Sequence, residues 1–281
     1  MIALFHYQCI QYAFIAGTFI SIVCAIIGYF VVLRGQAFAA EALTGVGFTG
    51  ATGAAIFGFS ALVGTFLFTI LVGLGMGAVG KRIKGRNIEI GMILSFALGL
   101  GVLFLKLYTT NASEAVGILF GSILSVTTGD LYISLFTIII ALLILFFIFR
   151  PLLFASVDLE VAEARGVPVT LLGIVFMALL ALTIAEAILV VGVLLVFALL
   201  IAPAATAQHI TNKPIKAIII SVILGLVFAW AGLLLGLFFH VPVSFFIAAT
   251  AAISYLIIVP LHHMITPHIY APLPNPHEET E

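Results

Sequence analysis

Long apolar runs, separated by short breaks that hold most of the basic residues, constrain the fold of this chain more than any other feature. The runs at 133–149 and 217–239 contain no charged side chain. A helix needs about 20 apolar residues to cross a hydrocarbon core roughly 30 Å thick. Hydrophobic residues make up 64% of the 281 residues and charged residues only 7%. The sequence therefore predicts a membrane protein.

Nine segments are long and apolar enough to be candidate spans, which predicts eight or nine crossings. They lack the alternating pattern of barrel strands, and helices satisfy their own backbone hydrogen bonds inside lipid. The predicted fold class is all-α, a polytopic membrane protein with eight or nine transmembrane helices. The candidates lie at 12–33, 38–57, 59–79, 88–107, 131–149, 169–187, 190–209, 216–239 and 243–261.

The basic residues predict the orientation of these spans. Cationic content is concentrated at 81–86, at 150–165 and at Lys213 and Lys216. Cytoplasmic loops are enriched in Lys and Arg, so all three connections should face the cytoplasm. Two candidate spans separate each connection from the next, which makes a common side possible. This predicts an outer amino terminus and an inner carboxyl terminus, and it requires that the stretch 113–126 does not cross.

The glycines in two stretches predict close helix packing rather than nucleotide binding. Residues 75–81 fit the first seven positions of a phosphate-binding loop, but such a loop needs Ser or Thr after the lysine, and Arg82 stands there. Glycines at 45, 47, 50 and 53 are also typical of a close-packing helix face. An intramembrane enzyme would need paired catalytic groups at depth, which the spans do not supply. We therefore expect a chain without its own ATPase or covalent chemistry.

The segment 156–168 combines helix-forming residues with charge. Asp158 and Glu160 stand at a possible helix start, where carboxylates favour the helix dipole. Gly166 and Pro168 would end that helix. We expect a short amphipathic helix between two spans, and the residues alone leave a solvated connector equally open.

Four blocks of this sequence resemble the ABC-3 family of metal-ion permeases, the membrane subunits of ATP-binding-cassette importers for zinc, manganese or iron. The blocks follow the family's order across about residues 12–260 and are Val31–Arg34, Leu119–Leu124, Ser156–Gly173 and Val190–Ala207. The resemblance implies an ABC importer permease fold, in the plasma membrane of a prokaryote, that works by alternating access.

The same resemblance implies partners and a cargo. A cytoplasmic ATP-binding subunit, an extracytoplasmic metal-binding protein and a second permease subunit, in a homodimer, are expected, with no nucleic acid. The cargo would be a divalent metal ion, with no cofactor bound by this chain. The 156–168 segment would be the coupling helix, and its ATPase-docking residues would be Asp158, Leu159, Glu160, Ala162, Ala164, Arg165, Gly166 and Val167.

Glu41 is the main candidate for the metal path. It lies inside a candidate span, where an ionised carboxylate needs a partner, a wet cavity or a proton. From its position alone it could instead reach cytoplasmic water beside Arg34. The resemblance implies a metal ligand, because family members carry an acid here, usually Asp, and a histidine four residues later on the same helix face. That histidine position is Gly45.

The missing histidine affects which ion such a path would suit. None of the seven histidines falls at the centre of a candidate span. An oxygen-only path built from Glu41, Thr44 and Glu186 would suit manganese or ferrous iron better than zinc, which prefers nitrogen and sulfur ligands. A permease of this family with a non-metal cargo is the alternative.

Two further polar residues have two interpretations each. Glu186 is either an acid at a turn between spans that touches water, or a second ligand or gate. His209 lies near the cytoplasmic end of its span, where it is either a helix-end residue or a possible exit for the cation.

We expect a permease domain at 1–265 and a disordered cytoplasmic tail at 266–281, because the tail is rich in proline. A different class of transporter, driven by an ion gradient, would use Glu41 and Glu186 as proton carriers. It would be favoured by repeated halves with matching broken helices, and we find no clear repeat.

Overall fold

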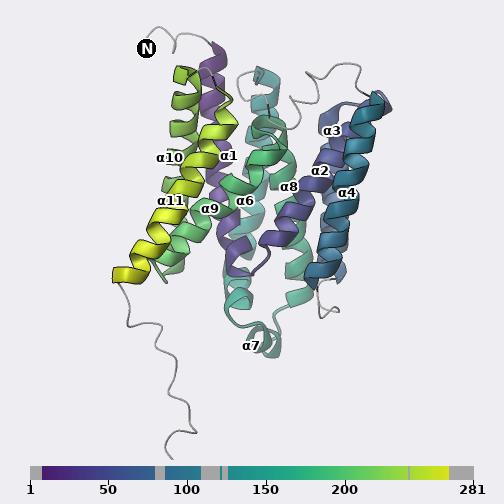
Figure 1. Ribbon diagram of the computed structural model, residues 1–281. Helices are drawn as coiled ribbons and strands as arrows, with labels where there is room; N and C mark the ends of the chain where they lie inside the picture. The colour runs from purple at the N-terminus through teal and green to yellow at the C-terminus, as the bar shows by residue number, and fades with distance from the viewer. Residues whose placement is uncertain (1–7, 80–85, 109–120, 122–125, 240, 266–281) are drawn as a thin grey trace, which may run out of the picture.

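The computed structural model describes residues 8–79, 86–108, 121, 126–239 and 241–265, and nearly all of them are helical (Figure 1). Each of the nine candidate spans coincides with one of the described helices, which confirms the predicted all-α polytopic fold. The described helices are α1 (Gln8–Leu33), α2 (Ala37–Ile56), α3 (Ala61–Val79), α4 (Arg86–Tyr108), α6 (Thr128–Val157), α7 (Leu159–Ala164), α8 (Val169–Val191), α9 (Val193–Ile210), α10 (Pro214–Phe239) and α11 (Val243–Ile265).

Seven of the described helices have the length and hydropathy to cross a bilayer. The helix α2 has a weaker apolar signal because Gly, Ala and Thr fill most of it. Small residues let neighbouring helices approach closely. Inside a membrane, helices associate through this close packing, because burying an apolar side chain against another helix gains little over burying it in lipid. A low-hydropathy helix surrounded by other helices is therefore compatible with a membrane fold, and the chain is a multi-pass membrane protein.

Successive long helices alternate in direction (Figure 1). Helix α1 begins at one end of the bundle, while α7, the α9–α10 connection and the last turn of α11 lie at the opposite end. The cationic connections at 150–165 and 213–216 thus share one end, as the charge pattern predicted, and we call this the cytoplasmic end. The basic cluster at 81–85, most of 113–126 and the tail at 266–281 lie outside the described residues.

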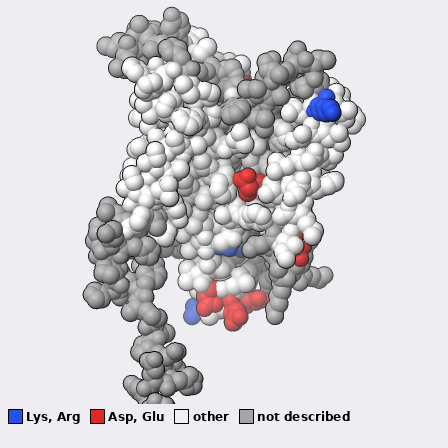
Figure 2. Space-filling model, viewed as in Figure 1, with Lys and Arg blue, Asp and Glu red and all other residues white. Residues whose placement is uncertain are grey.

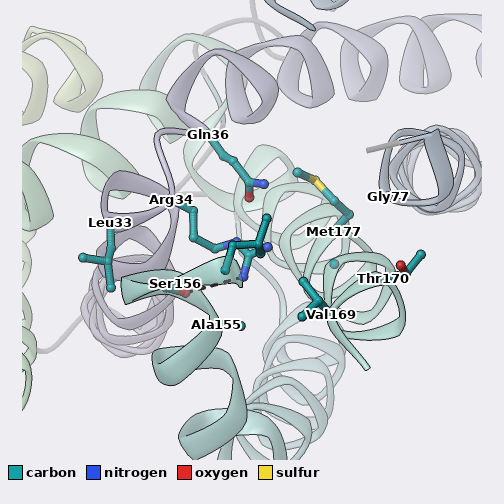
Figure 3. Close-up of a pocket in the computed structure, with 11 residues that line it drawn as sticks. Leu33, Arg34, Gln36, Gly77, Ala155, Ser156, Val169, Thr170 and Met177 are labelled. Atoms are coloured by element: carbon teal, nitrogen blue, oxygen red, sulfur yellow. Dashed lines mark hydrogen bonds between the residues drawn. The ribbon is translucent and has the colours of Figure 1, made fainter. Parts of the chain in front are cut away.

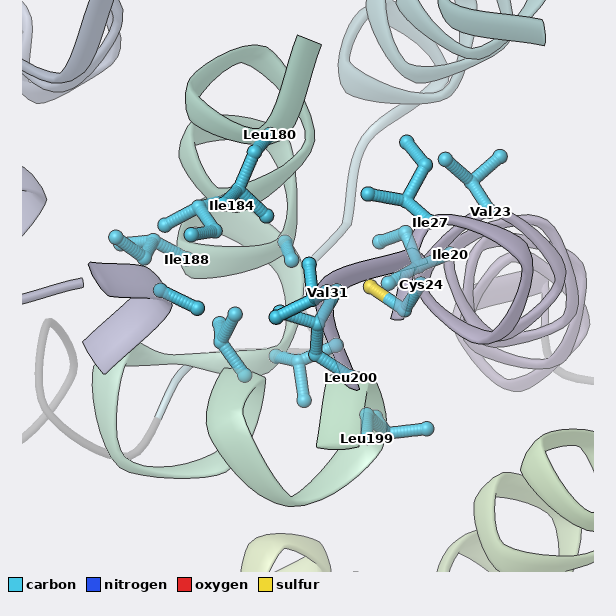
Figure 4. Close-up of a cluster of buried hydrophobic side chains, with 14 of the residues drawn as sticks. Ile20, Val23, Cys24, Ile27, Val31, Leu180, Ile184, Ile188, Leu199 and Leu200 are labelled. Atoms are coloured by element: carbon cyan, nitrogen blue, oxygen red, sulfur yellow. The ribbon is translucent and has the colours of Figure 1, made fainter. Parts of the chain in front are cut away.

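The packed interior is centred on α1, α8 and α9. Their side chains meet in one apolar cluster, shown in Figure 4, with Ile27, Leu180 and Leu200 fully buried. This cluster fixes α8, whose cytoplasmic end follows α7, against the middle of the bundle. A movement of α7 would therefore be transmitted to well-packed helices rather than to loose ones.

Glycines allow two of the closest helix approaches. A Cβ atom added at Gly28 in α1 would lie 1.8 Å from the carbonyl oxygen of Leu200 in α9. One added at Gly64 in α3 would lie 2.1 Å from the carbonyl oxygen of Gly50 in α2. The predicted close packing is therefore present, but the α2 glycines do not form a single face, because Gly53 meets α4 while Gly50 meets α3.

Candidate functional site

The carboxylate of Glu41 lies on α2, four residues after this helix begins at the cytoplasmic end. Its side chain is half-buried, and it makes no hydrogen bond or ion pair with any residue that the structure describes. Arg34 does not pair with it. The Arg34 guanidinium instead donates to the Ser156 hydroxyl over 3.4 Å and lies 5.4 Å from the centre of the Phe176 ring. Glu41 thus presents a half-buried acceptor group on α2.

The hydroxyl of Thr44 lies one turn along the same helix. It is 3% exposed and donates a hydrogen bond of 3.0 Å to the carbonyl oxygen of Ala40. Because its only proton is used within the helix, the hydroxyl can offer another group only its lone pairs. Glu41 and Thr44 therefore bring two oxygen acceptors to neighbouring positions of α2.

Gly45 is a packing position in this chain. A Cβ atom there would lie 2.9 Å from Cδ1 of Leu94 and 3.4 Å from Cγ of Leu98, both on α4. The ring of a histidine would need much more room than a Cβ atom, so α4 would have to move. The glycine at position 45 thus has two consequences: it allows the tight contact between α2 and α4, and it leaves this position without a nitrogen ligand.

Glu186 is buried inside the bundle. It is 4% exposed, and Oε1 of its carboxyl group accepts a hydrogen bond from Ser134 of α6. Its Oε2 has no hydrogen-bond partner among the described residues. Glu186 is also one of the residues that line a cavity of about 10 Å³ between α1, α6 and α8. The interpretation of Glu186 as a water-exposed acid at a turn is therefore wrong, because α8 continues past it to Val191.

Glu186 also points away from α2. Ile188, two positions further along α8, is the residue that meets α2, since its Cδ1 would lie 2.3 Å from a Cβ atom at Gly47. Two helix positions differ by about 200° around the axis. Within one chain, the structure therefore does not bring Glu186 together with Glu41 and Thr44.

We expect the Ser134–Glu186 hydrogen bond to stabilise the α6–α8 contact. Replacing Ser134 with Ala leaves both carboxyl oxygens without a partner in a buried site, and should lower the free energy of unfolding by about 1–3 kcal/mol. The Glu186→Gln variant keeps an acceptor for Ser134 and should cost less. Thermal unfolding in detergent measures both. The matched control is Ser254→Ala, because Ser254 bonds only within its own helix; equal losses at positions 134 and 254 would contradict the assignment.

A short helix stands where the coupling helix was expected. Asp158 caps α7 by accepting a hydrogen bond of 2.9 Å from the backbone N–H of Val161. Ala162 is fully buried and packs in a small cluster with Ala155, Val169 and Leu172, from the end of α6 and the start of α8. Gly166 adopts a φ of 79°, which turns the chain towards α8.

The exposed positions of α7, on both sides of the buried Ala162, carry apolar and acidic groups together. Leu159 and Val161 are 46% and 43% exposed, and Glu160 and Glu163 are exposed beside them. Figure 2 shows acidic side chains gathered at this end, below a largely uncharged band. The remaining positions of the expected docking set, Ala164, Arg165 and Gly166, are exposed, while Val167 is half-buried. This geometry offers a partner a short helix anchored on its inner face.

The ring of His209 packs edge-on against Tyr255 of α11, with 6.0 Å between ring centres. It lies in the last turn of α9, where a helix-end role was one of its two interpretations. Within the described residues, no group of three or more His, Cys, Asp or Glu side chains is placed to hold a metal ion. The described part of one chain therefore contains no closed metal centre built from these side chains.

Sequence reasoning missed two polar features. Ser134 stands in an apolar span, where a hydroxyl is a signal for a buried polar partner. Gln36 was also overlooked. Its Oε1 atom is buried and has no hydrogen-bond partner among the described residues. Nothing in its sequence context marks it, because polar residues are ordinary between two spans.

Known proteins are similar to this chain in sequence and in fold over most of its length. Residues 6–262 match the model of the ABC 3 transport family. The manganese transport system membrane protein MntC of Halalkalibacterium halodurans is 31% identical over 85% of this chain and 82% of that protein. The manganese import system permease protein ScaB of Streptococcus parasanguinis is 31% identical over 90% of each.

A solved structure gives the same result in three dimensions. The structure of PsaBC from Streptococcus pneumoniae in complex with Fab includes a chain that is 30% identical, with a TM-score of 0.82 over 95% of this chain and 99% of that one. Sequence, helix order and three-dimensional arrangement thus agree. This chain belongs to the ABC 3 transport family.

Proposed function

We propose that this chain is the transmembrane permease subunit of an ATP-binding-cassette importer for a divalent metal ion, with manganese as the main cargo. The observation that carries the proposal is Glu41, a half-buried carboxylate on α2 without a partner among the described residues. Relatives that are about 31% identical are named as manganese permeases. The chain is a transport subunit in the plasma membrane and not an enzyme, and it binds no cofactor of its own.

The ligand chemistry at Glu41 supports manganese over zinc. Thr44 adds a second oxygen acceptor. Position 45 is a glycine that packs against α4, so it does not provide the histidine nitrogen that zinc favours. Manganese accepts carboxylate, carbonyl and water ligands readily. We propose that the ion in transit exchanges part of its water shell for Glu41, and that Thr44 lies beside the same path. Glu186 has a structural role, since its hydrogen bond with Ser134 joins α8 to α6. His209 also has a structural role, since it packs the last turn of α9 against Tyr255 of α11.

A second copy of the chain completes this path. A carboxylate facing lipid is costly, so the half-buried Glu41 must face either a water-filled space or another protein surface. In a homodimer, two copies of α2 would place their acids along one shared conduit. Two carboxylates would also balance the charge of one divalent cation.

The energy for alternating access would come from a separate ATP-binding subunit docked on the coupling helix. The exposed Leu159 and Val161 provide apolar contact there, and Ala162 anchors the same helix to α6 and α8. An extracytoplasmic binding protein would deliver the ion at the other end. Membership of the ABC 3 family leaves the ion-driven secondary transporter without support.

Uptake into vesicles that contain the permease and its ATP-binding subunit tests this function. With ATP at the coupling-helix side and the binding protein at the other side, we expect manganese uptake to exceed zinc uptake by about tenfold, given the oxygen ligands. Omitting ATP should abolish it. Uptake without any ATP-binding subunit would refute the proposal. Co-purification of that subunit without uptake of manganese, ferrous iron or zinc would favour the second candidate, a non-metal cargo, for which the glycine at position 45 is the motivating observation.

A further inference from the structure

A pocket of about 310 Å³ opens at the cytoplasmic end of the bundle, and Glu41 is not among its lining residues. The α1–α2 turn, the end of α3, the end of α6 and the start of α8 converge on it. Figure 3 shows the Arg34 and Gln36 side chains reaching into the same space. The lining residues are Leu33, Arg34, Gln36, Gly77, Ala155, Ser156, Leu159, Val169, Thr170, Gly173 and Met177.

The charge of this pocket favours an anion. Arg34 is its only ionisable side chain among the described lining residues, and no acidic side chain is present there. A positively charged pocket would repel a divalent cation, so it does not fit the transported metal. The pocket therefore calls for a different ligand from the one proposed for Glu41.

Two helix starts add to this positive charge. Gln36 precedes the first residue of α2, and Val169 and Thr170 are the first residues of α8. Neither helix start receives a hydrogen bond from a capping side chain. Backbone N–H groups at helix starts carry partial positive charge and bind phosphate groups readily.

The hydrogen-bonding groups of the pocket indicate which chemical groups the ligand carries, in addition to its charge. Arg34 presents a planar fork of donors suited to phosphate oxygens, and its contacts with Ser156 and Phe176 hold it in place. The buried Oε1 of Gln36 is an acceptor without a partner among the described residues, so it calls for a donor on the ligand. A phosphate ester with a free hydroxyl, such as a glycerol phosphate group, supplies both kinds of group.

We propose that this pocket binds a phosphate ester that carries a hydroxyl group, supplied by an anionic phospholipid headgroup at the cytoplasmic leaflet or by a free glycerol phosphate. Basic pockets between transmembrane helices at the cytoplasmic side are a known way of holding lipid headgroups. Because Leu159 of α7 lines the pocket, the bound ester would brace the coupling helix against the α1–α2 turn that leads to Glu41.

Ligand-induced stabilisation of the full chain, purified in detergent with its associated subunits, tests the proposal. Dioleoylphosphatidylglycerol should raise the midpoint of thermal unfolding, and dioleoylphosphatidylcholine should not. The Arg34→Gln variant should weaken the phosphatidylglycerol effect about tenfold in the lipid concentration required. The matched control is Lys216→Gln, which removes one exposed positive charge at the same end outside the pocket and should change that concentration less than twofold.

Further arms identify the source and the hydroxyl. Glycerol 3-phosphate producing the same Arg34-dependent shift would assign a soluble ester, and a shift with the lipid alone would assign the headgroup. If Arg34→Gln does not fold, Gln36→Leu replaces it, and this variant should abolish the preference for phosphatidylglycerol over phosphatidic acid. Equal stabilisation by phosphatidylcholine, or equal losses at Arg34 and Lys216, would overturn the proposal. The proposal would also be overturned if the Arg34 or Gln36 variants no longer co-purified with the ATP-binding subunit but were stabilised by phosphatidylglycerol as strongly as the unchanged protein.

Discussion

Replacing Glu41 with Gln should reduce manganese uptake about hundredfold, while Glu41→Asp should retain most of it. The amide keeps the size of the side chain but removes the negative charge that would contact the cation. At an effective dielectric constant of about 20, two unit charges 4 Å apart interact by about 4 kcal/mol, and a divalent ion doubles this. A hundredfold loss corresponds to only about 2.7 kcal/mol. Initial rates in vesicles, measured as a function of manganese concentration, give the comparison.

The control for this prediction is Glu89→Gln, which makes the same chemical change in the first turn of α4. That variant should transport at close to the normal rate. Co-purification of the ATP-binding subunit and an unchanged unfolding midpoint would show that Glu41→Gln remains folded and assembled. Normal uptake of every divalent metal by Glu41→Gln would remove Glu41 from the path, even if the chain remains a permease.

The fold of this chain is largely predictable because the membrane imposes it. Each apolar run must form a helix that satisfies its own backbone groups, and the few basic residues orient the result. Even α2, with its many small residues, could be placed because its flanking turns at Gly35 and Gly58 interrupt the apolar pattern. Local composition is therefore enough to predict the helices, because a helix is the structure that an apolar segment of this kind forms inside lipid.

The direction in which a buried polar side chain points is harder to predict. Glu41 and Glu186 look alike in the sequence, as single acids within apolar runs. In the structure, Glu41 is half-buried on α2, whereas Glu186 is enclosed and bonded to Ser134, 52 residues away in the chain. Which face of a helix meets which neighbour depends on packing among all the helices. The residues around Glu41 and Glu186 therefore do not reveal which of the two is enclosed.

The coupling segment lies between these two cases. Asp158, Gly166 and Pro168 mark the ends of a helix by local chemistry, and α7 lies inside the expected 156–168 stretch. The burial of Ala162 has no such local mark. It depends on the end of α6 and the start of α8 coming together around a short connection, which is a tertiary effect.

An Ala162→Asp variant should reduce uptake about hundredfold while leaving the transmembrane bundle intact. A helix of six residues is not stable alone, so α7 depends on the contact of Ala162 with Ala155, Val169 and Leu172. A carboxylate buried there without a partner would cost about 3–5 kcal/mol, which the segment can avoid by leaving the bundle. The ATP-binding subunit would then pull on a detached segment, and its movement would not reach α6 and α8.

The readout that separates this effect from misfolding is the ratio of ions transported to ATP hydrolysed, measured in the same vesicles. Ala162→Asp should lower that ratio with little change in the unfolding midpoint of the bundle. The control is Asn212→Asp, which adds the same charge at an exposed position of the cytoplasmic end. Normal coupling in Ala162→Asp would show that α7 does not need its inner anchor. Force would then have to reach α6 and α8 through another contact.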